Sequence, residues 1–114
     1  MSKRILFVDD KKNPAEFGVA DCTVVRSARE AVHALEDAEW DVLYLDYYLD
    51  GNRPYPNGVD DVLSIVDPSR IPPKVIGISG DPSRASAVEG YAERFRDRAN
   101  SATRREIPDA DGGL

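Results

Sequence analysis

Four short apolar runs, each ending abruptly at polar residues, constrain the fold of this chain more than any other feature. They cover residues 5–8, 23–25, 42–45 and 75–78. Because these runs are apolar at nearly every position rather than at alternate ones, they are typical of strands buried on both faces of a parallel sheet. Helical or loop segments separate them, so the order predicts an α/β fold with right-handed crossovers and helices on both faces of the sheet.

Two helices have recognisable starts. Ser27 and Glu30 have the spacing of a capping box, and an apolar stripe follows, which predicts a helix over 28–39. Asp81 followed by Pro82 is a helix-start signature, an N-cap residue before proline at the first helical position. About two further helical turns are expected over residues 59–66.

The charge balance argues against nucleic acid as the main partner. The chain has 15 basic and 21 acidic residues and a net charge of −6 at pH 7, so it lacks the positive field that attracts a phosphate backbone. No run approaches the ~18 apolar residues that a membrane span needs, and the N-terminus lacks the apolar region of a signal peptide. We therefore expect a cytoplasmic protein without membrane contact.

The length of 114 residues fits one domain with little to spare. We expect this domain to cover residues 1–98. Residues 99–114 contain no apolar run, and this composition predicts a disordered C-terminal tail.

Carboxylates follow two of the predicted strands directly. Asp9 and Asp10 end the first strand and Asp46 ends the third. A single Asp after a strand is usually a turn or cap residue, but ligands of open α/β sheets bind beyond the carboxyl ends of the strands. If these two strands are neighbours, the three carboxylates converge in one pocket. Such crowding favours a hard divalent cation such as Mg²⁺, and a carboxylate beside that cation can attack a phosphoryl group.

These residues resemble the receiver domain of response regulators. The matching features are the Asp9-Asp10 pair, the run Asp46-x-x-Leu-x-Gly51, and Ser79 after the fourth strand. The resemblance implies a flavodoxin-like sheet of strand order 2-1-3-4. It also implies that Asp46 is the phosphoacceptor and that Ser79 is a catalytic hydroxyl contacting the phosphoryl group. The metal ligands that it implies are Asp9, Asp10, Asp46 and the backbone carbonyl of Tyr48.

A compact relative, the cyclic-phosphate-processing receiver family, is similar in outline. The corresponding stretches are Leu45-Asp-Tyr-Tyr-Leu49, Asn57-Gly-Val-Asp60 and Ile78-Ser-Gly-Asp-Pro82. Both histidines of the family pattern are replaced, by Tyr47 and Ile78, which argues against the same catalysis. Compact versions of this kind are common on phage genomes, so the resemblance suggests a phage origin.

The chain departs from a typical receiver in lacking a fifth strand and its lysine. No apolar strand follows Ile78, and no lysine follows Lys74. Arg84 of the last helix is one candidate source of the missing positive charge.

Three functional hypotheses remain open. The first is a stand-alone receiver-like signalling module that binds Mg²⁺ and accepts or recognises a phosphoryl group at Asp46. Its expected partners are a phosphodonor protein or small phosphate ester and a protein target. The second is a binder or hydrolase of cyclic phosphates or nucleotides. The third is a non-catalytic interaction protein on a degenerate receiver fold.

Overall fold

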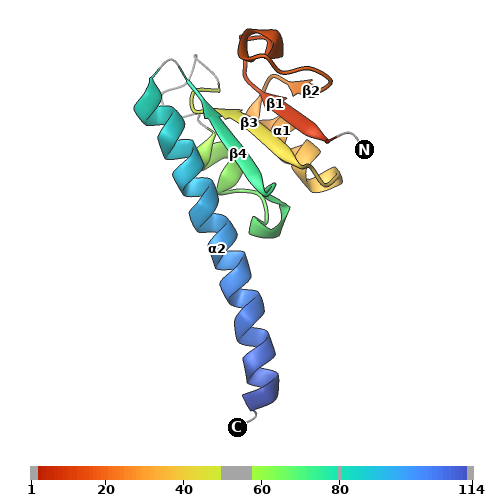
Figure 1. The fold of residues 1–114 in the computed structure, drawn as a ribbon, viewed down its shortest axis with the longest axis vertical. Helices are drawn as coiled ribbons and strands as arrows, with labels where there is room; N and C mark the ends of the chain where they lie inside the picture. The colour runs from red at the N-terminus through yellow and green to blue at the C-terminus, as the bar shows by residue number, and fades with distance from the viewer. Residues whose placement is uncertain (1–2, 50–57, 80, 113–114) are drawn as a thin grey trace.

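Four parallel strands form one sheet in the order β2-β1-β3-β4 (Figure 1). The computed structural model describes residues 3–49, 58–79 and 81–112, with side chains in the last helix described as far as Asp97. The strands are β1 (Ile5–Val8), β2 (Thr23–Val25), β3 (Val42–Asp46) and β4 (Lys74–Ile78). This order and the parallel pairing confirm the predicted receiver-like topology, including the absence of a fifth strand from the described part of the chain.

Within the described residues, five helical segments connect or follow the strands. They are η1 (Pro14–Phe17), α1 (Ala28–Asp37), η2 (Val59–Leu63), η3 (Pro68–Arg70) and α2 (Pro82–Gly112). The Ser27 hydroxyl accepts the Glu30 amide N–H at 3.2 Å, so α1 begins where the capping pattern predicted. It ends two residues before the predicted end at 39, because Ala38 is already extended. The turns expected over 59–66 take the form of a short π-helix, η2.

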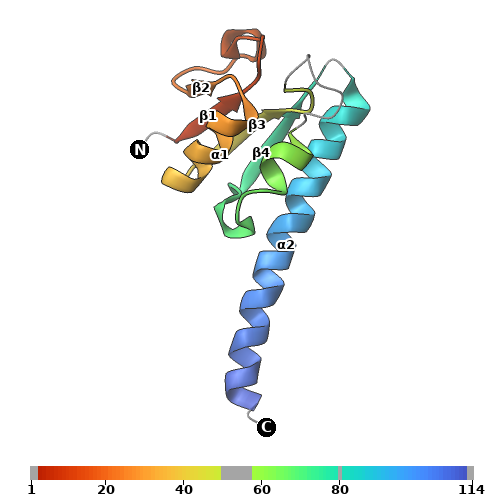
Figure 2. The same cartoon turned by 180° about the vertical axis from the view of Figure 1, so that it is seen from behind.

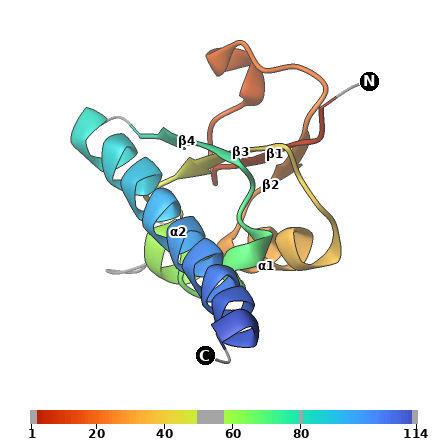
Figure 3. The same ribbon diagram turned by 60° about the horizontal axis from the view of Figure 1, so that its bottom comes forward.

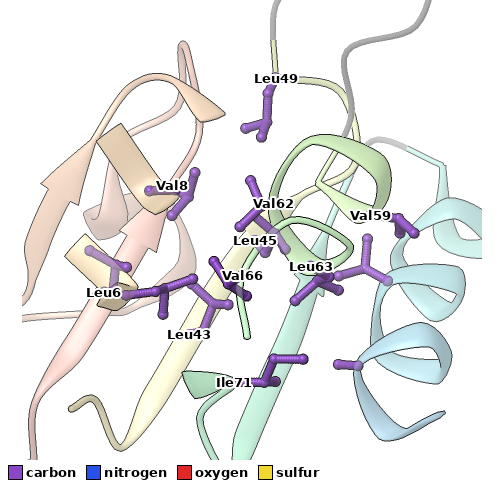
Figure 4. Close-up of a cluster of buried hydrophobic side chains, with 14 residues drawn as sticks. Leu6, Val8, Leu43, Leu45, Leu49, Val59, Val62, Leu63, Val66 and Ile71 are labelled. Carbon is purple, nitrogen blue, oxygen red and sulfur yellow. The ribbon is translucent and has the colours of Figure 1, made fainter. Parts of the chain in front are cut away.

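The larger hydrophobic core lies on one face of the sheet (Figure 4). Leu6, Val8, Leu43 and Leu45 point from β1 and β3 to this face and are fully buried. Figure 3 shows α1, η2 and α2 together on this side. Their contributions to the core include Ala31, Leu35, Val59, Val62, Leu63, Val88 and Ala92.

The opposite face carries a smaller aromatic cluster. Phe7 of β1 lies between Phe17 of η1 and Tyr44 of β3, with ring centroids 5.7 and 5.9 Å away. Helical segments therefore lie on both faces, as predicted, but η1 supplies only about one turn on this side. The view from behind shows α1 crossing the face of the sheet that carries the larger core (Figure 2).

Helix α2 runs along β4 at the edge where a fifth strand would otherwise pair (Figure 1). A Cβ added at Gly77 would lie 2.0 Å from the carbonyl oxygen of Ala85, so only glycine lets the helix approach this closely. The Gly77 amide N–H donates to Glu89 Oε2 at 2.9 Å. Arg96 Nη1 donates to the carbonyl oxygens of Pro72 and Pro73 at 2.8 and 2.7 Å. Side chains of the helix therefore satisfy one outer amide of the edge strand and two carbonyl groups of the segment that leads into it.

The C-terminal part of α2 extends past the sheet (Figure 1). The domain boundary at residue 98 and the disordered tail over 99–114 stay predictions about the chain in solution. No helix in the described ranges is both long and apolar enough to span a bilayer.

Candidate functional site

The three predicted carboxylates meet where β1 and β3 end. These strands pair with Val8 opposite Leu45, so the next residues along each strand, Asp9 and Asp46, end side by side. Asp10 completes the group, and the three side chains each offer an oxygen within 4.8 Å of the others. They border a hollow of about 190 Å³ whose lining residues are Asp9, Asp10, Lys11, Lys12, Asp46, Tyr48 and Ser79. All five residues singled out from the sequence therefore lie around one pocket.

Asp9 is held rigidly and only partly satisfied. Its side chain is 1% exposed. Oδ1 accepts the backbone N–H groups of Lys11 and Lys12 at 2.8 and 2.9 Å. Oδ2 is buried and has no hydrogen-bond partner in the described part of the chain. An unsatisfied buried acceptor costs free energy, and a cation in the pocket would remove that cost.

Asp46 is strongly perturbed. Burial and then the negative charge of Asp9 raise the pKa of its carboxyl from 3.8 to about 7. The Tyr48 amide N–H, which donates to Asp46 Oδ1 at 3.3 Å, and the positive charge of Lys12 act in the opposite direction and lower this pKa. The pocket therefore disfavours three ionised carboxylates unless further positive charge enters.

The donor set fits a hard divalent cation. The oxygens come from three carboxylates close together, and one buried oxygen lacks a donor among the described residues. Mg²⁺ prefers oxygen ligands of this kind and is commonly held by one or two carboxylates. Asp9, Asp10 and Asp46 are the residues that would hold it, with the Tyr48 carbonyl as a further predicted ligand.

Ser79 lies on the opposite rim, after β4. Its Oγ accepts the Asp81 amide N–H at 3.1 Å, and no acceptor for the hydroxyl proton is found among the described residues. Asp81 also caps α2, because its Oδ1 accepts the Ser83 amide N–H at 3.0 Å. Ser79 is therefore coupled directly to the start of α2. Gly51 and Asn57 of the sequence motifs lie outside the described residues.

Gly58 packs tightly against the end of β3. Its amide N–H donates to the Tyr47 carbonyl at 2.8 Å. A Cβ at this position would lie 2.4 Å from the Asp46 carbonyl oxygen and 2.7 Å from Leu45 Cγ. Only glycine fits here, and its close contact fixes the end of the strand that carries Asp46.

Arg26 and Lys12 are site residues that sequence reasoning missed. Arg26 follows β2, and its Nη1 donates to the carbonyl oxygens of Asp9 at 3.1 Å and Lys12 at 2.5 Å. Its Nη2 donates to Asn13 Oδ1 at 3.1 Å. Arg26 thus fastens the loop that carries two carboxylates. Its position directly after the strand beside β1 is the available sequence signal, and this position alone does not distinguish Arg26 from an ordinary residue at a strand end.

Arg84 does not line the pocket. Its guanidinium carbon lies 5.0 Å from the centre of the Tyr47 ring, and its Nη1 donates to the Tyr47 hydroxyl at 3.5 Å. Tyr47 in turn packs edge-on against Tyr48, with ring centroids 4.9 Å apart. The guanidinium is therefore engaged by an aromatic side chain.

Comparison with known proteins agrees with this architecture. The family model of the cyclic-phosphate processing receiver domain matches residues 4–94, which cover the sheet, the acidic pocket and the first part of α2. The chain belongs to this family. No curated protein and no solved structure matches the chain.

This cyclic-phosphate processing receiver domain has no imidazole at its pocket. Tyr47 and Ile78 occupy the two positions at which the family resemblance implies histidine. His33 is the only histidine of the chain, and it lies on α1 beside a separate hollow formed with Ile65 and Asp61. The chemistry of the pocket therefore depends on carboxylates, a hydroxyl and lysine.

Proposed function

We propose that this receiver domain binds Mg²⁺ in its acidic pocket and accepts or recognises a phosphoryl group at Asp46. The observation that carries the proposal is the group of three carboxylates within 4.8 Å, one of which has a buried oxygen without a donor among the described residues. Such a group is unfavourable on its own and becomes favourable once a divalent cation binds. A phosphodonor protein or a small phosphate ester would be the source of the phosphoryl group.

Asp46 supplies the nucleophile. One carboxylate oxygen attacks the phosphorus of the donor, a new O–P bond forms, and the donor's P–O bond breaks. The leaving oxygen keeps the electron pair and takes a proton from water where it needs one. When bound, Mg²⁺ supplies positive charge that offsets the charge on the phosphoryl oxygens. The Tyr48 amide orients Asp46, and the free hydroxyl proton of Ser79 donates to a phosphoryl oxygen.

Incubation with acetyl phosphate and Mg²⁺, followed by intact-mass measurement, tests the proposal. The wild type should gain one phosphoryl group under conditions that modify a known receiver domain. Asp46→Asn should gain none, and Asp97→Asn, which changes an exposed carboxylate on α2, should behave as the wild type. A wild type that stays unmodified, or a modified Asp46→Asn, would contradict phosphoryl acceptance at this residue.

The family match favours a second candidate, the binding or hydrolysis of cyclic phosphates or nucleotides. The lack of an imidazole at the pocket weakens hydrolysis by acid–base catalysis, but binding of the phosphate needs only the cation and hydrogen-bond donors. Titration of 2′,3′-cyclic nucleotides with Mg²⁺, read by thermal shift and product analysis, separates the two functions. Binding or turnover that disappears in Asp10→Asn, without phosphorylation of Asp46, would favour the second.

A third outcome would point to a protein that keeps the fold without the chemistry. It predicts no response to Mg²⁺, phosphodonor or cyclic nucleotide. Asp46→Asn would then change only the stability of the protein.

A further inference from the structure

A phosphoryl group at Asp46 needs more positive charge than one Mg²⁺ supplies. The divalent cation offsets two of the three carboxylate charges, so an incoming phosphate-like anion still meets a negative pocket. The described part of the chain has no fifth strand from which a cation could reach the pocket. A basic side chain from another element must therefore balance the anion.

Lys12 is placed for this role by the loop after β1. It lines the same hollow as Asp46 and Ser79 and is partly buried there. Its amide N–H donates to Asp9 Oδ1 at 2.9 Å, and its carbonyl oxygen accepts Arg26 Nη1 at 2.5 Å. Both backbone groups of the residue are thus fixed, which holds the base of a long side chain at the pocket.

The ammonium group of Lys12 can leave its present contact at little cost. It lies 5.8 Å from the centre of the Phe17 ring, which is 39% exposed. A cation–π contact at such an exposed site is weak, whereas a charge-assisted hydrogen bond to a phosphoryl oxygen is considerably stronger. The positive charge of Lys12 lowers the pKa of Asp46, in keeping with the position of both residues around one hollow.

The other cations near the pocket among the described residues are less suited. Arg26 is engaged by the oxygens of Asp9, Lys12 and Asn13. Arg84 is stacked on Tyr47. Lys11 also borders the hollow, but it is exposed to solvent, whereas Lys12 is partly buried.

We propose that Lys12, from the loop after β1, is the cation that pairs with the phosphoryl group in this pocket, in place of a lysine from a fifth strand. This inference rests on the proposed function. It assigns anion recognition to the loop that Arg26 fastens and that η1 follows, on the side of the pocket away from β4.

Beryllofluoride, a mimic of a phosphoryl group on a carboxylate, tests this assignment. Mg²⁺ binding is measured first by calorimetry, and beryllofluoride binding is then measured by fluorine NMR at saturating Mg²⁺. Lys12→Met should weaken beryllofluoride binding by about tenfold to a hundredfold while Mg²⁺ binds as tightly as before or more tightly. Lys12→Arg should retain most of the affinity. Lys74→Met, which removes an exposed lysine at the start of β4, should match the wild type.

Unchanged beryllofluoride binding by Lys12→Met would overturn the proposal. A loss seen instead in Lys11→Met or Arg84→Met would also overturn it and would identify the true cation. The thermal midpoint without ligands shows whether each variant is folded. Failure of the proposed function is distinguishable, because the wild type itself would then bind no Mg²⁺ or no beryllofluoride, and both proposals would fall.

Discussion

Asp9 and Asp46 end neighbouring strands side by side, and the charge of Asp9 helps raise the pKa of Asp46 to about 7. The pair stores electrostatic repulsion in the folded state that a chain without this fold would not experience. Binding of a cation relieves this repulsion. The three carboxylates therefore lower the stability of the metal-free protein and raise its affinity for a divalent cation. This relationship affects two measurable quantities, the free energy of unfolding and the affinity for Mg²⁺.

Asp46→Asn should stabilise the metal-free protein at alkaline pH. The Asp46 pKa is about 7 in the folded state and 3.8 unperturbed, so between these values the unfolded chain binds fewer protons than the folded one. Stability due to this group is therefore full below about pH 4 and is lost as pH rises through 7. We expect the free energy of unfolding of Asp46→Asn to exceed that of the wild type by about 1 to 2 kcal/mol at pH 8 and to differ little near pH 4. The value at pH 8 allows for screening of the charges by water in the open pocket. Urea unfolding at several pH values measures it.

Asp97→Asn is the control for that series, since this carboxylate is exposed on α2. Its effect on the free energy of unfolding should not vary over the same pH window. An equal and pH-independent gain in both variants would mean that the pocket does not cause the effect.

Mg²⁺ should raise the free energy of unfolding of the wild type. At free Mg²⁺ about 100 times the dissociation constant, the gain is about 2.7 kcal/mol. Asp10→Asn should abolish most of this gain because it removes one of the three carboxylates. Thermal melts over a series of Mg²⁺ concentrations provide the measurement, and a Na⁺ series at the same ionic strengths is the control. A gain that persists in Asp10→Asn would place the cation elsewhere.

Arg26→Met should weaken Mg²⁺ binding although Arg26 lies outside the carboxylate group. The guanidinium holds the carbonyl oxygens of Asp9 and Lys12, and its loss should let the loop move and spread the ligands. We expect a loss of about tenfold or more in affinity by calorimetry. Arg29→Met, on the exposed surface of α1, supplies a charge-matched control. Equal effects of the two substitutions would indicate a general charge effect instead.

The sequence was sufficient to predict the ends of the strands and the carboxylates on them, because strand ends and parallel order are local and topological properties. Lys12 could not be identified in this way, since its position depends on how the loop folds onto Asp9. The role of Arg26 was equally hidden, because the groups that its guanidinium contacts lie at least 13 residues away along the chain. The closed edge of β4 depends on contacts between Gly77, Glu89 and the helix backbone, which no local pattern encodes.

Gly77→Ala should destabilise the protein strongly. The new Cβ would lie 2.0 Å from the Ala85 carbonyl oxygen, and because that atom is backbone, the whole helix has to shift. We expect a loss of about 2 kcal/mol or more, at the upper end of overpacking costs. Gly90→Ala is a matched control on α2, where a Cβ meets nothing within 4 Å. It should stabilise by about 0.5 to 1 kcal/mol. Chemical denaturation of both variants measures the change in the free energy of unfolding and shows whether each substitution stabilises or destabilises the protein.

Amides of residues 99–112 should exchange with deuterium much faster than those near Val88 and Ala92, which are buried against the sheet. The segment has no apolar run, and Pro108 provides no N–H for a helical hydrogen bond. Hydrogen exchange followed by mass spectrometry measures this difference. Strong protection of 99–112 would contradict the predicted disordered tail.

The small size of Gly77 sets the spacing between α2 and β4. The residue at this position therefore determines how closely the helix can cover the edge of the sheet. In a relative with any larger residue there, the helix has to stand further off, and the outer backbone groups of the strand become available for pairing. We therefore expect the residue at this position to distinguish, from sequence alone, family members whose sheet edge is covered by a helix from those whose edge strand can pair with a further strand.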